Sequence, residues 1–233
     1  MDEKIRISEA LQAAQSRADV MNLCSSVEIT GLSAALMRKL LRALRSYNET
    51  TDTVHERKPL HIAYLGNVTF DPLPDYVEVA AACHGISTRT YVAGYGQYMQ
   101  ELIGDGAALN EFAADFIFIN LDMRELAPDI ATGFTSLGKE QLLDSRDRIL
   151  STVRECIRLA LGRQQATVIV ANFPAPASFQ YGIADQKQSC GEGEFYSELN
   201  TELKNTARED ARVHVLDVER LAALHGKAEV PGT

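Results

Sequence analysis

The stretch that decides the fold begins at His61 and contains HIAYLGNVTFDPL (61–73), GISTRTYVAGYGQYMQEL (85–102) and ADFIFINLDMREL (114–126). In each segment an apolar run typical of a buried strand is followed by polar or glycine residues. Helical patterns separate the runs, which predicts parallel strands at residues 61–65, 87–92 and 115–121. Open α/β sheets bind ligands at the shared edge where parallel strands end. We therefore expect a ligand site at this edge.

The pattern continues through the second half of the chain. Two further apolar runs predict strands at residues 166–173 and 212–218, and amphipathic runs between them predict a long helix at about 139–161 and another within 195–210. Alternating strands and helices are typical of a doubly wound parallel sheet. The predicted fold class is α/β, with a doubly wound parallel five-stranded sheet in a flavodoxin-like three-layer sandwich and a helical amino-terminal extension.

The first fifth of the chain has a different pattern. Residues 1–50 contain two amphipathic helical stretches, ISEALQAAQSRADVMNL (7–23) and LSAALMRKLLRAL (32–44). A polar segment without periodicity follows and ends in proline, as linkers often do. The predicted division is a helical extension at 1–50, a linker at 51–59 and the α/β domain at 60–233.

Composition excludes several function classes. The 233 residues carry a net charge of −9, which argues against nucleic acid or an anionic membrane as a partner. No apolar run reaches the roughly 20 residues of a membrane helix. The amino-terminal MDEKIRISEALQ lacks the apolar core of a secretion signal, so we expect a cytoplasmic protein. The four cysteines and five histidines form no ligand spacing, and no metal site is predicted.

The strand motifs, taken with VIVANFPAP (168–176) and VHVLDVERLAALHGK (213–227), resemble the amino-terminal part of FkbH-like proteins. These belong to the HAD superfamily, subfamily IIIC, of polyketide and related pathways. The resemblance covers about residues 60–228 and implies an SGNH-hydrolase-like domain. It implies a downstream HAD domain or an acyl carrier protein as partner, and a small acyl or glycerate-like ligand.

Such proteins load a glyceryl unit as a thioester, so the phosphopantetheine arm of a carrier protein would be a substrate. No cofactor is expected in this segment. The chain has no DLDNT-type motif, and magnesium-dependent phosphoryl chemistry is therefore not assigned to it.

Compared with an SGNH hydrolase, the catalytic set is altered. Such enzymes use a serine after the first strand, and a histidine base three residues after an aspartate. Here Asn67 and Val68 stand where the Asp-Ser pair is expected, and Thr69 is the only hydroxyl in that loop. The Asp-x-x-His spacing is absent. His225 is the candidate base, although it would also satisfy carbonyl groups at a helix end.

The predicted ligand-binding residues follow the first three strands; they are Gly66, Asn67, Gly94, Gly96, Gln97, Asn120 and Asp122. Several site residues also have structural interpretations: a helix cap for Thr69 and Asp122, a turn contact for Asn67, and positive-φ turns for Gly94 and Gly96. The leading hypothesis is a ligand-binding domain whose hydrolase machinery has eroded.

Two alternatives stay open. One is an active esterase or acyltransferase that uses Thr69, and the other is a structural interaction module built on the amino-terminal helices. Four basic side chains of one helical stretch would suit docking of an acidic carrier protein or simply form a solvated face; they are Arg38, Lys39, Arg42 and Arg45.

Overall fold

The computed structural model describes residues 3–28, 32–47, 58–104, 108–163 and 165–227. The chain forms two compact units, Met1–Ile62 with Phe70–Thr90, and Ala63–Thr69 with Tyr91–Thr233. Most of the predicted linker lies outside the described residues. The predicted boundaries at 50 and 59 stay a prediction.

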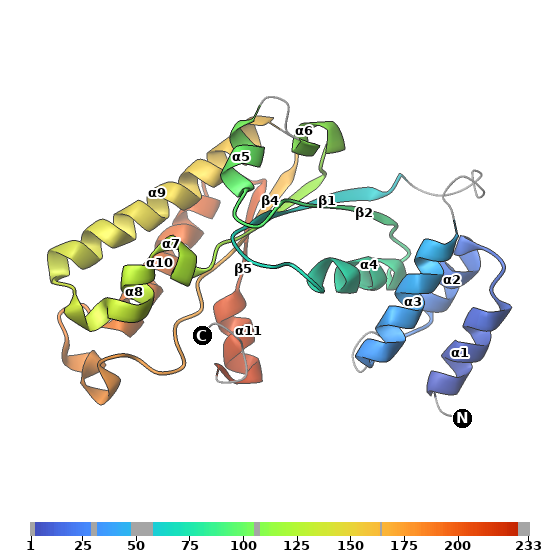
Figure 1. The fold of residues 1–233 in the computed structure, drawn as a ribbon, viewed down its shortest axis with the longest axis horizontal. Helices are drawn as coiled ribbons and strands as arrows, with labels where there is room; N and C mark the ends of the chain where they lie inside the picture. Colours follow the sequence, from blue (N-terminus) through green and yellow to red (C-terminus); the bar gives the residue numbers. More distant parts are fainter. Residues whose placement is uncertain (1–2, 29–31, 48–57, 105–107, 164, 228–233) are drawn as a thin grey trace. The chain divides into compact units, whose positions relative to one another are not determined.

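The first unit is a helical cluster (Figure 1). It contains α1 (Glu3–Ala13), α2 (Arg17–Ser25), α3 (Ala34–Ser46) and α4 (Leu73–Cys83). Ser16 and Asp19 form a capping box that fixes the start of α2. The apolar face of α3 packs into a core shared with the other helices, and α4 contributes Val79 and Ala82 to it. A helix that follows the first strand in sequence thus completes the core of the amino-terminal helices.

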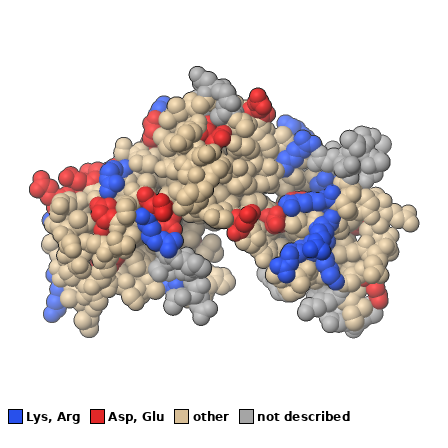
Figure 2. All heavy atoms as spheres, in the orientation of Figure 1, with Lys and Arg blue, Asp and Glu red and all other residues tan. Residues whose placement is uncertain are grey.

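The opposite face of α3 is basic. Lys and Arg side chains gather on this part of the molecule (Figure 2). Arg45 contacts Asp75 at 2.8 Å and Glu78 at 2.6 Å, whereas Arg38 and Arg42 are exposed and form no ion pair among the described residues. The suggested docking role of this face stays a prediction.

The sheet confirms the predicted fold class. Its strands are β1 (Leu60–Gly66), β2 (Thr88–Val92), β3 (Phe116–Asn120), β4 (Thr167–Ala171) and β5 (Val213–Leu216). The spatial order is β2-β1-β3-β4-β5, and β3, β4 and β5 pair in parallel, with Ile117 opposite Val168 and Val168 opposite Val213. In this order the direction of winding reverses between β1 and β3, which is where doubly wound sheets usually bind ligands.

The second unit adds the remaining helices. They are α5 (Tyr98–Ile103), α6 (Ala108–Phe112), α7 (Met123–Leu126), α8 (Pro128–Gly133), α9 (Lys139–Arg163), α10 (Glu192–Ala207) and α11 (Val218–His225), with 3-10 turns at Phe134–Ser136 and Gly182–Lys187. The segment 128–136 is helical because Pro128 suits a first helical position and Ile130 and Phe134 are buried one turn apart. The sequence PDIATGFTSLG (128–138) has the composition of a loop, and that interpretation is wrong for residues 128–136.

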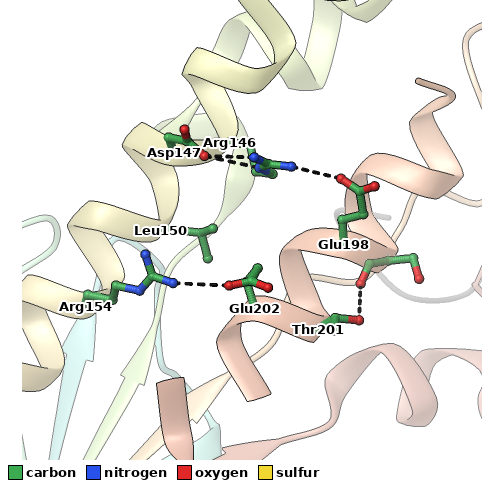
Figure 3. Close-up of a pocket in the computed structure, with 8 residues that line it drawn as sticks. Arg146, Asp147, Leu150, Arg154, Glu198, Thr201 and Glu202 are labelled. Carbon is green, nitrogen blue, oxygen red and sulfur yellow. Dashed lines mark hydrogen bonds and ion pairs between the residues drawn. The ribbon is translucent and has the colours of Figure 1, made fainter. Parts of the chain in front are cut away.

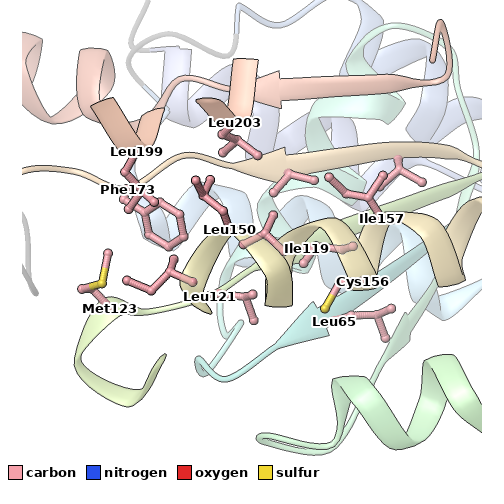
Figure 4. Packing of buried hydrophobic residues seen from close by; sticks show 14 of the residues in the cluster. Leu65, Ile119, Leu121, Met123, Leu150, Cys156, Ile157, Phe173, Leu199 and Leu203 are labelled. Carbon is pink, nitrogen blue, oxygen red and sulfur yellow. The ribbon is translucent and has the colours of Figure 1, made fainter. Parts of the chain in front are cut away.

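The core of this unit lies between the strands and α9 and α10. Strand residues such as Leu65 and Ile119 pack against Leu150 and Cys156 of α9, and Leu199 lies on α10 (Figure 4). These side chains are at most 3% exposed. The packing holds the carboxyl ends of β1, β3, β4 and β5 in fixed positions, so the residues just after them are presented on a rigid frame.

No helix in the described part of the chain is both long and apolar enough to cross a membrane.

Candidate functional site

The loops that follow β1 and β3 are joined through Asn67. Its side chain is 7% exposed, and its Oδ1 accepts a hydrogen bond from the Asp122 backbone N–H at 2.6 Å. Its Nδ2 donates to the Asp122 carbonyl at 3.3 Å. The structure therefore brings Asn67 and Asp122 together as expected. However, both the oxygen and the nitrogen of the Asn67 side-chain amide are hydrogen-bonded to backbone groups of Asp122. The turn contact suggested for Asn67 is replaced by this bridge between two loops.

Asp122 also has a structural role. Its Oδ1 accepts from the Arg124 backbone N–H at 2.8 Å, so it caps α7, as the sequence predicts. Its Oδ2 forms an ion pair with the Arg124 guanidinium at 2.5 Å. Hydrogen bonding from that guanidinium outweighs burial and lowers the pKa of Asp122. The carboxylate is therefore ionised and held by its own helix.

The loop after β2 meets the end of β1 through backbone groups. The Gly96 N–H donates to the Gly66 carbonyl at 3.2 Å, and Gly96 has φ of +69°, which confirms the positive-φ turn. Gly94 does not have positive φ; a Cβ there would collide with Gln97 Oε1, so glycine allows the Gln97 side chain to lie close. Gln97 is exposed and precedes α5, while Asn120 is half-buried at the end of β3. Their roles toward a ligand stay predictions.

The two candidate catalytic residues are both exposed. Thr69 does not cap α4, because that helix begins after Pro72 and has no side-chain cap; the capping interpretation is wrong. His225 is the last residue of α11. Within the described ranges, no hydrogen bond joins Thr69 to His225. A nucleophile works only within hydrogen-bond reach of its base, and the structure provides no such contact for this pair.

A second polar network lies where β4 and β5 end, at residues that sequence reasoning did not select. Asn172 is 3% exposed; its Nδ2 donates to Asp217 Oδ1 at 2.7 Å, and its Oδ1 accepts from the Glu219 backbone N–H at 3.0 Å. Glu219 accepts from the Ala175 N–H at 2.7 Å and from Lys227 Nζ at 2.5 Å. These bonds fix the first turn of α11 against the end of β4.

This network forms one wall of a cavity of about 280 Å³ between α10 and α11. Helix α10 contributes Tyr196, Ser197 and Lys204, and α11 contributes Arg220. Lys204 Nζ lies 3.8 Å from Asp217 Oδ2. Burial, with smaller contributions from the charges of nearby carboxylates, raises the pKa of Tyr196, so its phenol stays protonated.

Asp217 is ionised at this cavity. Burial alone would raise its pKa, but the hydrogen bonds from the Asn172 amide and the Arg220 backbone N–H, together with the charge of Lys204, hold the pKa of Asp217 below its ordinary value. Arg220 stands three residues after Asp217, where the Asp-x-x-His spacing would place a base. A guanidinium stays protonated in proteins and cannot act as a general base. The same spacing rule, applied to VLDVER, could have identified Arg220 from sequence.

Another cavity, of about 400 Å³, lies between α9 and α10 (Figure 3). Its charges compensate one another, since Arg146 contacts Glu198 at 3.0 Å and Arg154 contacts Glu202 at 3.3 Å. These pairs are partly exposed, and such pairs contribute little to stability. The cavity lies along helix surfaces rather than at strand ends, and we assign no ligand to it.

No cluster of three or more His, Cys, Asp or Glu side chains with metal-binding geometry occurs among the residues that the structure describes.

Comparison with known proteins identifies similar folds. The chain is similar to the N-terminal part of the protein BF1531 from Bacteroides fragilis, a crystal structure that contains a phosphatase domain complexed with Mg. The TM-score is 0.60 at 13% identity, over 92% of this chain and 48% of that one. The two share a fold, and this chain spans about half the length of that structure.

Two hydrolases are more distant. The lipase Lip_vut3 from a goat rumen metagenome has a TM-score of 0.48 at 12% identity, over 70% of this chain and 82% of the lipase. A putative acylhydrolase from Bacteroides fragilis NCTC 9343 has a TM-score of 0.40 at 17% identity, over 71% and 72% of the two chains. No family model and no curated protein matches the chain.

Proposed function

We propose that this chain is the SGNH-like domain of an FkbH-like protein that loads glyceryl or acyl groups. In this proposal the domain binds its ligand at the carboxyl ends of the strands and has lost the hydrolase machinery. The motif resemblance supports it, as does the fold shared with a BF1531 fragment whose structure contains a phosphatase domain. The activity of a whole loading protein would require a separate catalytic domain.

The observation that carries the proposal is the identity of the residue three positions after Asp217. Arg220 replaces the base, Val68 stands where the nucleophile is expected, and Thr69 has no hydrogen-bonded base among the described residues. A hydrolase needs both groups, because neither an isolated hydroxyl nor an isolated base forms an acyl-enzyme efficiently. Binding without hydrolysis suits a protein that must keep a thioester intact.

The ligand in this proposal is an acyl group, a glycerate-like molecule, or the phosphopantetheine arm of an acyl carrier protein. The carrier protein or a HAD domain would be the partner. The domain itself would hold the ligand and exclude water, and it would need no cofactor of its own.

Two measurements on the whole chain test this function. We expect no labelling by a fluorophosphonate, and turnover of p-nitrophenyl acetate no faster by the wild type than by Thr69→Ala. We also expect pantetheine to shift backbone amide resonances of the strand-end loops in NMR spectra. Labelling at Thr69 with turnover lost in the variant would instead identify an esterase or acyltransferase. Absence of both turnover and binding would favour a structural interaction module.

A further inference from the structure

We infer that the cavity between α10 and α11 is an anion site, in which Arg220 and Lys204 bind a phosphate or carboxylate group of a small ligand. The inference deepens the proposed function, on which it rests, by naming the charged group that a ligand at the strand ends carries.

The first step concerns donors. The Arg220 guanidinium lines the cavity and forms no hydrogen bond or ion pair within the described part of the chain. Its five N–H groups are therefore available to a planar or tetrahedral anion. Lys204 is 3.8 Å from Asp217, which is beyond hydrogen-bond distance, so its ammonium keeps donors for a ligand. Tyr196 and Ser197 line the same space, and each carries a hydroxyl donor.

The second step concerns acceptors. The two carboxylates at this site are already engaged by protein donors. Asp217 Oδ1 accepts from Asn172 and from the Arg220 backbone N–H, at 2.7 and 3.1 Å. Both oxygens of Glu219 accept, one from the Ala175 N–H and the other from Lys227. Asp217 Oδ2 accepts no hydrogen bond within the described residues and lies 3.8 Å from Lys204 Nζ, so it is the charged acceptor left beside the donors of Arg220 and Lys204.

The third step concerns charge and rigidity. The lining carries two cations, Arg220 and Lys204, and two carboxylates, Asp217 and Glu219. Lys227, which is not part of the lining, pairs with Glu219, so Arg220 and Lys204 face one remaining carboxylate, Asp217. Arg220 is held on a helix whose first turn is fixed by the buried Asn172 amide. The Arg220 side chain is exposed, but its backbone is fixed in this turn and loses less entropy on ligand binding than the backbone of a mobile loop. The cavity of about 280 Å³ suits a small polar group rather than a long acyl chain.

The test is titration of the whole chain with inorganic phosphate and, in parallel, with acetate, followed by NMR. We expect phosphate to bind with saturable shifts in α10 and α11, and the double variant Lys204→Gln with Arg220→Gln to weaken binding at least tenfold. The matched control is Lys187→Gln with Arg208→Gln, which removes the same charge from two exposed positions and leaves affinity within twofold. Circular dichroism checks folding, and each single variant is measured separately.

The outcomes are distinct. Equal affinity in the wild type and the Lys204/Arg220 double variant overturns the inference. A comparison of pantetheine with its 4′-phosphate separates the two proposals. If pantetheine binds and the phosphate adds no affinity, the anion site is wrong and the proposed function stands. If the double variant still binds pantetheine but loses the extra affinity that the 4′-phosphate gives, both the anion site and the proposed function stand. Stronger binding of acetate than of phosphate identifies the carboxylate as the anion source.

Discussion

Two buried asparagines at strand ends differ in what surrounds them. Asn67, after β1, and Asn172, after β4, each use both ends of the side-chain amide in hydrogen bonds. Asn67 binds backbone groups of Asp122, and Arg124 then pairs with that carboxylate. Asn172 instead positions Asp217 and α11 beside an open cavity. The residue type at a strand end therefore does not identify a ligand group; the inferred anion site rests instead on donors without protein partners beside a cavity.

The replacement Asn172→Ala should have the largest effect. It removes a hydrogen bond to an ionised carboxylate and one to a backbone N–H in a buried site, and we expect a loss of about 3 kcal/mol in the free energy of unfolding. Phosphate affinity should also fall several-fold, because α11 is no longer fixed at its first turn. Urea unfolding and phosphate titration measure both. An unchanged phosphate affinity would contradict the functional difference that we draw between Asn172, after β4, and Asn67, after β1.

The replacement Asn67→Ala should have the next largest effect on stability. It leaves the Asp122 backbone N–H without its 2.6 Å partner, and we expect a loss of about 2 kcal/mol by urea unfolding. Asn120→Ala is the matched control, because this half-buried side chain should cost less than about 0.5 kcal/mol. Equal losses in the two variants would contradict the structural role assigned to Asn67.

A pH experiment tests the burial of a carboxylate at the start of α10, the helix that lines one side of the cavity. Burial raises the pKa of Glu192, the first residue of α10, above its ordinary value of 4.5. The folded state therefore binds this proton more tightly, so the contribution is full below pH 4.5 and is lost as pH rises through the folded-state pKa. The slope from one group is at most about 1.4 kcal/mol per pH unit.

The measurement is the difference in unfolding free energy between wild type and Glu192→Gln from pH 4 to pH 8, since subtraction removes the opposing contribution of the other carboxylates. The wild type should lose stability relative to the variant as pH rises. A difference that is flat with pH would show that Glu192 titrates normally.

The smallest effect is expected in the cavity between α9 and α10. Arg154 and Glu202 form a partly exposed pair at 3.3 Å, and a double-mutant cycle with alanine should give a coupling of about 0.5 kcal/mol or less. Phosphate should not shift resonances of these two residues. A coupling above about 1 kcal/mol would show that this cavity is less exposed to solvent screening than its geometry indicates.

The sequence determined the strands well. The predicted run 61–65 corresponds to β1 at Leu60–Gly66, and 115–121 contains β3 at Phe116–Asn120. A short apolar run between polar loops is typical of a strand in a parallel sheet, because helices cover both faces of such a sheet. The cap at Asp122 and the turn at Gly96 were also predictable, because both depend on neighbours within a few residues.

Only the tertiary structure decided which polar side chains are engaged in hydrogen bonds within the protein. Asn67 and Asp122 are 55 positions apart, and Asn172 and Asp217 are 45 apart, so their hydrogen bonds depend on which strands lie side by side. Local pattern carries no information on that adjacency, since it arises from long-range packing of the sheet. For the same reason, the sequence predicted a site at the first three strands. The spacing rule could have identified Arg220, but the cavity that Arg220 shares with Lys204 beside the ends of β4 and β5 is visible only in the structure.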